Sequence, residues 1–301
     1  RHRATHQVVE GGAVLRDPLA IPVLGIPAAT LREDASAHPE RGSMRWFICA
    51  RSRFAEDCVA DTVRHGPSQL VILGAGLDTF GYRHGWPGLR VVEIDHPDTQ
   101  RWKLDRLLAA GIDPSPVRHY SLDFERDDLS GALGRVVDAD SPVLVWWLGV
   151  TPYLTREAIR ATLAALATMA STGAQSAPAG VAVVLDHASP ISGTRPEHQA
   201  AMRRPRARAA AVGEPWLSEF EPGDMTGELR RAGFDQVLPI DERAVIRRAL
   251  DGAVTTEAIR SSTVGGAPAG GEPTGGTAVA VPRPTHLMLA TRHWNTHGLA
   301  R

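Results

Sequence analysis

The sequence predicts an α/β fold, with a doubly wound and mostly parallel sheet of seven strands. Continuous apolar runs such as LVIL, VLVWWL and VAVVL are the first sign, because strands buried on both faces have this composition. These runs alternate with segments of helical periodicity, which is the rhythm of a Rossmann-like sheet covered by helices. A Gly-x-Gly turn directly follows the first run, where such a sheet turns tightly into its next element.

A helical N-terminal extension over residues 1–66 precedes the sheet. Three prolines between Asp17 and Ala28 predict a connector there. Residues 44–64 lack proline and glycine and carry apolar residues at helical spacing, so we expect one long helix. The predicted strands are Gln69–Leu73, Arg90–Ile94, Val117–Ser121, Val143–Leu148, Val181–Leu185, Gln236–Ile240 and Thr285–Ala290. Helices are predicted at Thr99–Ala110, Arg156–Met169 and Asp224–Ala232.

Two stretches interrupt this rhythm. Residues 189–221 contain four prolines and a basic middle, which predicts a lid-like insertion over the sheet edge. Residues 263–284 are rich in Gly, Pro and Ala, a composition that predicts a flexible loop. We therefore expect a single domain over 1–301, with the extension at 1–66, a cofactor-binding half at 67–188, the insertion at 189–221 and a C-terminal part at 222–301.

Composition narrows the function classes. The net charge of −1 gives no general attraction to nucleic acid or anionic membranes, and the local cluster of arginines at 203–208 is typical of a solvated face. No apolar stretch approaches the roughly 18 residues of a membrane span. The two cysteines, Cys49 and Cys58, form neither a disulfide framework nor a zinc site. We expect a soluble, cytoplasmic protein without a metal, with no nucleic-acid or membrane partner.

The Gly-x-Gly turn is the first candidate binding feature. Gly74 and Gly76 permit a tight turn and close approach of a ligand to the backbone, ahead of a predicted helix. The third glycine of a dinucleotide fingerprint would fall at Thr79, so that fingerprint is not met. A purely structural turn is the alternative.

Carboxylates follow the next two strands. Asp95, 19 residues after Gly76, can accept both ribose hydroxyls of an adenosine ligand. Glu93 is an equal candidate, because strand alternation puts it on the same face as Asp95; a helix cap is the structural alternative for Asp95. Asp123 could accept from the exocyclic amine of adenine while Phe124 packs on the ring, although aspartates in loops are common. Ligands of open α/β sheets bind at this edge.

The chain resembles the leucine carboxyl methyltransferase family, and most closely its bacterial branch of polyketide-type O-methyltransferases. The matching segments are RSRFAEDCV (51–59), LVILGAGLDTFGYR (70–83), LRVVEIDHPDTQRWK (89–103), LDFERDDL (122–129), WWLGVTPYLTREAI (146–159) and GEPWLSEFEPGDMTGELRRAGF (213–234). The resemblance implies a class I methyltransferase fold, S-adenosyl-L-methionine as cofactor and S-adenosyl-L-homocysteine as product. It also implies O-methylation of a small-molecule acceptor of secondary metabolism, on a carboxylate or a hydroxyl.

The resemblance also implies roles for single residues. Arg51 matches the arginine that pairs with the methionine carboxylate of the cofactor, and an ion pair with Glu56 or Asp57 on its own helix is the alternative. Gly74 and Gly76 match the glycine turn, Asp95 the ribose carboxylate, and Asp123 with Phe124 the adenine contacts. Eukaryotic members carry a glutamate where this chain has Leu148, which puts a protein-phosphatase substrate in doubt.

The acceptor side is less specified. A carboxylate acceptor needs no general base, whereas a phenol or alcohol does. His187, after the fifth predicted strand, and Tyr153 are candidate catalytic residues, with loop and core roles as their alternatives. Two other functions stay open: a nicotinamide-dependent oxidoreductase on a similar sheet, and a non-catalytic module that binds S-adenosyl-L-methionine. The sequence does not predict the oligomeric state.

Overall fold

The computed structural model describes residues 1–64, 68–169, 180–190, 206–207, 209–211, 213–251 and 285–294. The chain divides into two compact units, one of Arg1–Phe54 with Asp241–Pro282 and one of Ala55–Ile240 with Arg283–Arg301. Most of the insertion predicted at 189–221 and all of the loop predicted at 263–284 lie outside the described residues. The domain organisation given above stays a prediction.

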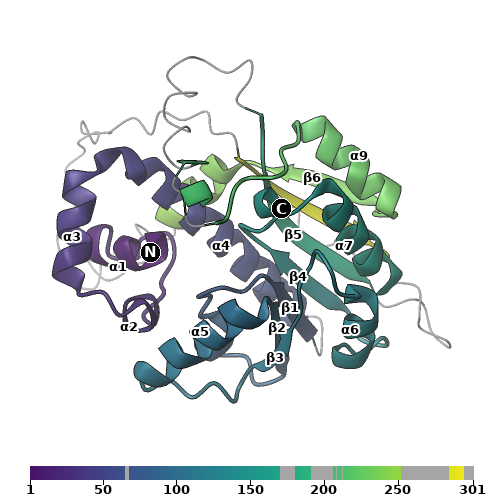
Figure 1. Ribbon diagram of the computed structural model, residues 1–301, viewed down its shortest axis with the longest axis horizontal. Coiled ribbons are helices and arrows are strands. Elements are labelled where there is room, and N and C mark those ends of the chain that lie inside the picture. Colours follow the sequence, from purple (N-terminus) through teal and green to yellow (C-terminus); the bar gives the residue numbers. More distant parts are fainter. Residues whose placement is uncertain are drawn as a thin grey trace, which may run out of the picture. The chain divides into compact units, whose positions relative to one another are not determined.

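In the part of the second unit that the structure describes, seven strands form one sheet in the order β3-β2-β1-β4-β5-β7-β6 (Figure 1). Its strands are β1 (Ser68–Leu73), β2 (Leu89–Asp95), β3 (Arg118–Ser121), β4 (Val143–Trp147), β5 (Val181–Ala188), β6 (Gln236–Ile240) and β7 (Thr285–Arg292). The first five strands pair in parallel, and β7 runs antiparallel to both β5 and β6. The predicted class I methyltransferase-like fold is confirmed.

Helices cover both faces of this sheet. On one face α6 (Leu129–Val136), α7 (Arg156–Met169) and α9 (Pro222–Ala232) pack on alternate strand residues such as Val71 and Val145, forming one hydrophobic core (Figure 1). On the other face α5 (Pro97–Ala109) brings Lys103 against Glu93 of β2. Strands β1, β4 and β5 are buried on both sides, as their continuous apolar runs predict.

Parallel pairing places the carboxyl ends of neighbouring strands at one edge of the sheet. Leu73 of β1 pairs with Ile94 of β2, and Ile72 pairs with Trp146 of β4. The order reverses between β1 and β4, because β2 and β3 continue on one side and β4 and β5 on the other. Such a switch point is where open α/β sheets bind ligands.

The first unit is helical in its N-terminal part. It contains α1 (His2–Val9), α2 (Ala20–Leu24), α3 (Ala28–Ala37), the short 3-10 helix η1 (Pro39–Arg41) and the start of α4 (Gly42–Val63). A buried polar network holds α1: His6 Nε2 accepts from Val14 N at 3.1 Å, and Arg45 donates two hydrogen bonds to one oxygen of Glu10 and a third to the other. The network satisfies polar groups that burial would otherwise leave unpaired.

Two local predictions are wrong, and helix α6 was not predicted. The connector expected between Asp17 and Ala28 contains α2, because Pro22 lies in the first turn, where its missing N–H is not needed. After Gly76 there is only the 3-10 helix η2 (Phe80–Tyr82), since Asp78 Oδ1 accepts from Phe80 N at 2.8 Å and fixes a tight turn. Helix α6 lies between β3 and β4 without a counterpart among the predicted helices.

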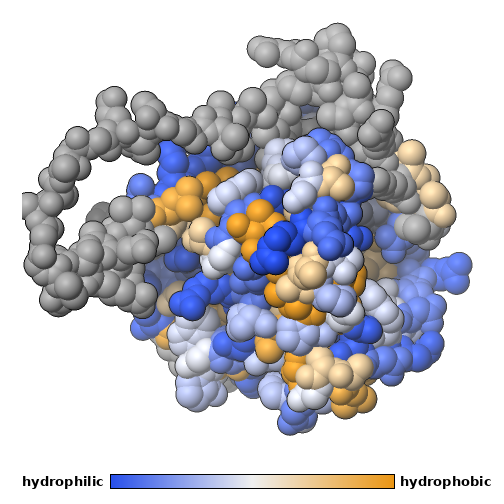
Figure 2. Space-filling model, turned by 90° about the vertical axis from the view of Figure 1, so that its left-hand side faces the viewer, coloured by the Kyte–Doolittle hydropathy of each residue, from blue (hydrophilic) through white to orange (hydrophobic). Residues whose placement is uncertain are grey.

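The surface of the described residues is mixed. Hydrophilic and hydrophobic residues are interspersed on the face drawn in Figure 2. Large exposed hydrophobic side chains, such as Trp102 and Leu217, occur at separate positions, which is normal for a protein surface. Within the described ranges, no helix is both long enough and apolar enough to cross a membrane.

Candidate cofactor site

The two glycines of the turn after β1 differ in the space that surrounds them. Gly74 has φ of 63°, and a Cβ atom there would lie 2.3 Å from Val150 Cγ2. Gly76 has φ of 47°, and a Cβ atom there would meet nothing within 4 Å. The first glycine is therefore required by the protein itself, whereas the second leaves open space beside the backbone. That space is what close approach of a ligand needs.

The variant Gly74→Ala is expected to lower the free energy of unfolding by about 2–4 kcal/mol. The clash with Val150 adds to the strain of a left-handed backbone at a residue with a Cβ atom. Urea denaturation measures the loss. Adding Val150→Ala should recover the part that comes from the clash, and Gly76→Ala should lose only the backbone contribution, about 1 kcal/mol. Equal losses at the two glycines would contradict this account.

Asp95 closes the turn from the end of β2. Its Oδ2 accepts from Gly76 N at 2.6 Å and its Oδ1 accepts from His96 N at 2.7 Å. The residue is 8% exposed, and burial raises the pKa of its carboxyl above the usual value despite these two hydrogen bonds. His96, rather than Asp95, caps α5. Each carboxylate oxygen has a second lone pair, so Asp95 can accept further hydroxyl donors.

Glu93, the other candidate on the same face, is engaged elsewhere. Its Oε2 lies 2.5 Å from Lys103 Nζ, and both residues are 1% exposed. His119 Nδ1 lies 3.6 Å from the same oxygen, and Tyr82 Oη lies 3.1 Å from His119 Nε2. Burial raises the pKa of Glu93 to about 7. The pair locks α5 onto β2, which leaves Asp95 as the carboxylate at the turn.

Asp123 lies after β3, in a turn that is stabilised by hydrogen bonds of Asp123 itself. Its backbone N donates to Asp127 Oδ2 at 2.8 Å, and its Oδ1 accepts from Glu125 N at 2.9 Å. Phe124 is half-buried against the hydrophobic core. Leu122 N donates to Asp95 O at 2.9 Å, so the turn is fastened next to the end of β2. The adenine contacts assigned to Asp123 and Phe124 stay predictions.

Arg51 lies on α4, in the first unit, and is half-buried. Its Cζ atom lies 5.8 Å from the centre of the Phe47 ring. Glu56, offered above as its ion-pair partner, forms an ion pair with Arg83. The pairing of Arg51 with a cofactor carboxylate stays a prediction.

The candidate catalytic residues lie at the ends of β4 and β5. β5 runs to Ala188, three residues further than predicted, because it continues to pair with β7, so His187 is inside a strand rather than after one. Its ring stacks on His286 with centroids 5.2 Å apart, and burial lowers its pKa to about 4. Tyr153 is half-buried in the 3-10 helix η3 (Thr151–Tyr153). Their catalytic roles stay predictions.

Replacing His187 by glutamine is expected to flatten the acid limb of the stability profile. The native pKa of about 4 is below the ordinary value of 6.5, so the unfolded chain binds the proton first and stability falls as the pH drops from about 6.5 to about 4. The full effect is about 3 kcal/mol. Urea denaturation of both proteins between pH 4 and 7 measures it, and identical pH slopes would contradict a buried neutral imidazole.

Sequence reasoning missed the residues that hold the loop after β4. Asp186 Oδ1 accepts from Gly149 N at 2.5 Å, and Asp186 O accepts from Thr151 Oγ1 at 2.8 Å. These bonds fix Val150 against Gly74. The signal available was a lone aspartate near the end of the apolar run VAVVL.

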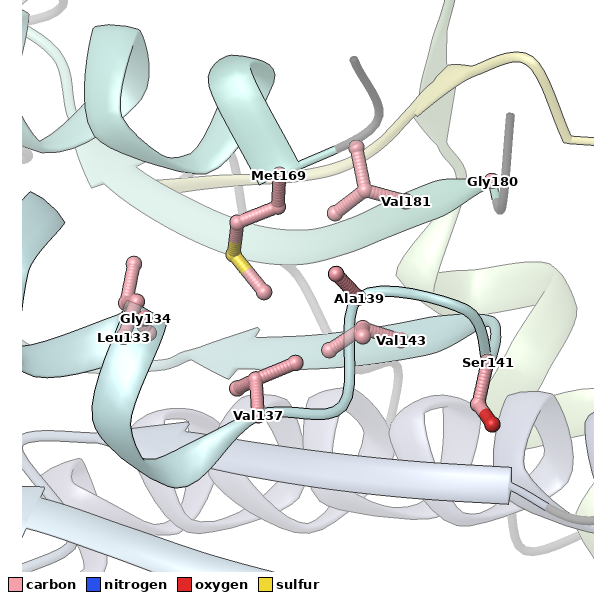
Figure 3. Close-up of a pocket in the computed structure, with 9 residues that line it drawn as sticks. All are labelled: Leu133, Gly134, Val137, Ala139, Ser141, Val143, Met169, Gly180 and Val181. Atoms are coloured by element: carbon pink, nitrogen blue, oxygen red, sulfur yellow. The ribbon is translucent and has the colours of Figure 1, made fainter. Parts of the chain in front are cut away.

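A small apolar cavity lies at the opposite edge of the sheet (Figure 3). It has a volume of about 50 Å³, and Met169 extends from the end of α7 toward Val143 at the start of β4. Ligand pockets have volumes of about 300–1,000 Å³. This cavity is a packing void, and it is separate from the glycine turn and Asp95.

The fold and the switch-point site define a class I methyltransferase-like protein. A crystal structure of a "putative methyltransferase" from Thermobifida fusca shares this fold, with a TM-score of 0.52, 15% identity, and coverage of 96% of this chain and 93% of that one. The leucine carboxyl methyltransferase family matches residues 1–167, more than half of the chain. The chain belongs to the leucine carboxyl methyltransferase family.

Curated relatives agree with this assignment. A Saccharopolyspora erythraea protein, named "Putative S-adenosyl-L-methionine-dependent methyltransferase", is 32% identical over 176 residues, 56% of this chain and 61% of that protein. A Bacillus subtilis protein of the same description is 31% identical over 194 residues, 62% of this chain and 60% of that protein. The chain thus spans about three fifths of the length of these relatives.

Proposed function

We propose that this chain is an S-adenosyl-L-methionine-dependent O-methyltransferase that acts on a carboxylate or hydroxyl of a small molecule of the polyketide or secondary-metabolite type. The observation that carries the proposal is the Asp95–Gly76 contact at the switch point, with open space beside Gly76. Membership of the leucine carboxyl methyltransferase family supports it. The names of the relatives support the same cofactor.

The residues at the turn fit an adenosine-type ligand. When bound, S-adenosyl-L-methionine supplies a methyl group activated by a sulfonium. Asp95 would accept the ribose hydroxyls through the free lone pairs of its carboxylate, and Asp123 with Phe124 would hold the adenine. The Val150 loop, fixed by Asp186, keeps the turn rigid, so that the cofactor meets a preformed surface.

His187 bears on the choice between acceptor groups. Because burial lowers its pKa to about 4, it is a weak base at neutral pH. An acceptor that is already an anion needs no base, which favours a carboxylate over a hydroxyl. Tyr153 is proposed to line the acceptor side.

Calorimetric titration of the protein with S-adenosyl-L-methionine and with S-adenosyl-L-homocysteine tests the proposal. We expect micromolar binding of both. NADH, titrated in parallel and followed by its fluorescence, is expected not to bind. Binding of NADH without either sulfur ligand would replace the proposal by the oxidoreductase alternative, and no binding of any of the three by the folded protein would refute it.

A further inference from the structure

A cleft of about 520 Å³ lies within the second unit, well inside the size range of small-molecule pockets. Among the described residues, its polar lining includes Arg156, Arg206 and Glu219, and its apolar lining includes Trp216 and Leu217. Nothing in the cofactor site described above uses these residues. The cleft thus combines a charged part with an aromatic part.

The cleft lies at the same sheet edge as the glycine turn. Leu217 N donates to Pro152 O at 2.6 Å, and Phe220 N donates to Ala188 O at 2.8 Å. The segment that lines the cleft is therefore fastened to the loop after β4 and to the last residue of β5. The loop after β4 also contains Val150, which packs against Gly74. An occupant of the cleft would lie at the same edge of the sheet as the proposed cofactor turn.

The charges of the described lining residues, two arginines and one glutamate, do not cancel. Arg206 forms an ion pair with Glu219, and its Cζ atom lies 5.2 Å from the centre of the Trp216 ring. Arg156 has no acidic partner in the described part of the chain: its Nη2 donates to the backbone carbonyl of Glu219 at 2.5 Å, and its Cζ lies 4.2 Å from the centre of the Phe220 ring.

These two contacts orient the exposed Arg156 side chain, and no described carboxylate forms an ion pair with it. Its Nε and Nη1 atoms make no hydrogen bond within the described ranges. A guanidinium with free N–H groups is the side chain best suited to a carboxylate or phosphate. The indole and Leu217 offer the apolar surface on which the body of a ligand would pack.

We infer that this cleft binds an organic anion with an apolar or aromatic body, and that Arg156 holds its acidic group. The inference rests on the proposed function and deepens it, because the anion would be the methyl acceptor.

Fluorine NMR titration of the full chain with para-trifluoromethylbenzoate tests it, in the presence of saturating S-adenosyl-L-homocysteine. The matched neutral probe is para-trifluoromethylbenzamide, which has the same shape without the charge. We expect the acid to bind about tenfold more tightly than the amide, the scale of one charge-assisted hydrogen bond. Equal affinities, or no binding of the acid at millimolar concentration, would overturn the inference.

Variants of Arg156 test whether this residue causes the preference for the acid over the amide. Arg156→Gln is expected to remove the preference for the acid, and Arg156→Lys to keep part of it, because the charge remains. Arg230→Gln, an exposed arginine of α9, is the control for total charge and should keep the whole preference. A structural role alone would weaken both probes equally, so an unchanged acid-to-amide ratio in Arg156→Gln would refute the assignment.

The same samples separate the two proposals. Calorimetry with S-adenosyl-L-homocysteine alone reports on the cofactor turn. If that ligand fails to bind while the acid is still preferred over the amide, the proposed function fails and the anion cleft stands. If it binds and the preference is absent, the cleft inference fails alone.

Discussion

Lys103→Met is expected to lower the free energy of unfolding by about 3–5 kcal/mol, among the largest losses available to a single substitution in this chain. Lys103 Nζ lies 2.5 Å from Glu93 Oε2, and both side chains are almost fully buried. Removing the ammonium leaves a buried carboxylate without its cation, next to His119 and to the carboxylates of Asp78 and Asp95. Urea denaturation at pH 6 and at pH 8 measures the loss.

The loss should grow with pH. Burial already raises the pKa of Glu93 from 4.5 to about 7, and without Lys103 the pKa rises further. The native state then holds a proton that the unfolded chain releases, so stability is present below about pH 4.5 and is lost as the pH rises through the native pKa. A loss of the same size at both pH values would contradict a buried carboxylate as the cause.

Two further variants complete this test. Adding Glu93→Gln to Lys103→Met removes the uncompensated charge and should restore most of the stability. Arg101→Met, in an exposed pair with Asp98 on the same helix, should change stability by less than about 1 kcal/mol. If the double variant is as unstable as Lys103→Met alone, the loss comes from packing rather than from charge.

The central strands could be predicted because each contains several consecutive apolar residues. Four consecutive apolar residues in LVIL and in VAVV cannot all be buried on a half-exposed sheet, so a covered parallel sheet follows directly. The end of β5 was missed because Asp186 and His187 interrupt the apolar run. Their strand conformation depends on pairing with Leu287 and His286, about a hundred residues away in the sequence.

Helix α6 carries an apolar pattern in its own sequence. Leu129, Ala132, Leu133 and Val136 have the i, i+3, i+4, i+7 spacing of a buried stripe. The two glycines within the helix lower its intrinsic propensity, and packing against α7 outweighs them. After Gly76 the opposite holds, because a helix was predicted there and the structure has a turn closed by Asp78. The turn leads into Phe80, whose ring packs on Trp146.

The choice between Glu93 and Asp95 could not be made from the sequence. Both lie on one face of β2, and the residue that separates them is a lysine on the following helix. Lys103 is ten residues from Glu93, in a segment whose other charges are mostly exposed. Only the packing of α5 on β2 shows that one carboxylate is neutralised internally and the other accepts hydrogen bonds at the turn.

Asp95→Ala is expected to weaken the binding of S-adenosyl-L-homocysteine by about 1–3 kcal/mol, which is about a 5- to 150-fold increase in Kd. The loss has two sources. The ribose hydroxyls lose their acceptor, and the amides of Gly76 and His96 lose the oxygens that hold the turn in place. Calorimetry below the unfolding temperature of the variant measures the binding.

Asp95→Asn tests whether the loss depends on the number of acceptor atoms or on the negative charge. The amide keeps one acceptor oxygen but presents an NH2 group to the second backbone N–H, so one of the two turn bonds is lost while the side-chain shape is kept. We expect an intermediate Kd. Asp98→Ala removes an exposed carboxylate from the first turn of α5 and should leave the Kd unchanged. An unchanged Kd in Asp95→Ala would remove Asp95 from the cofactor site, whereas equal losses in Asp95→Asn and Asp95→Ala would mean that the carboxylate charge itself, rather than the number of acceptor atoms, binds the ligand.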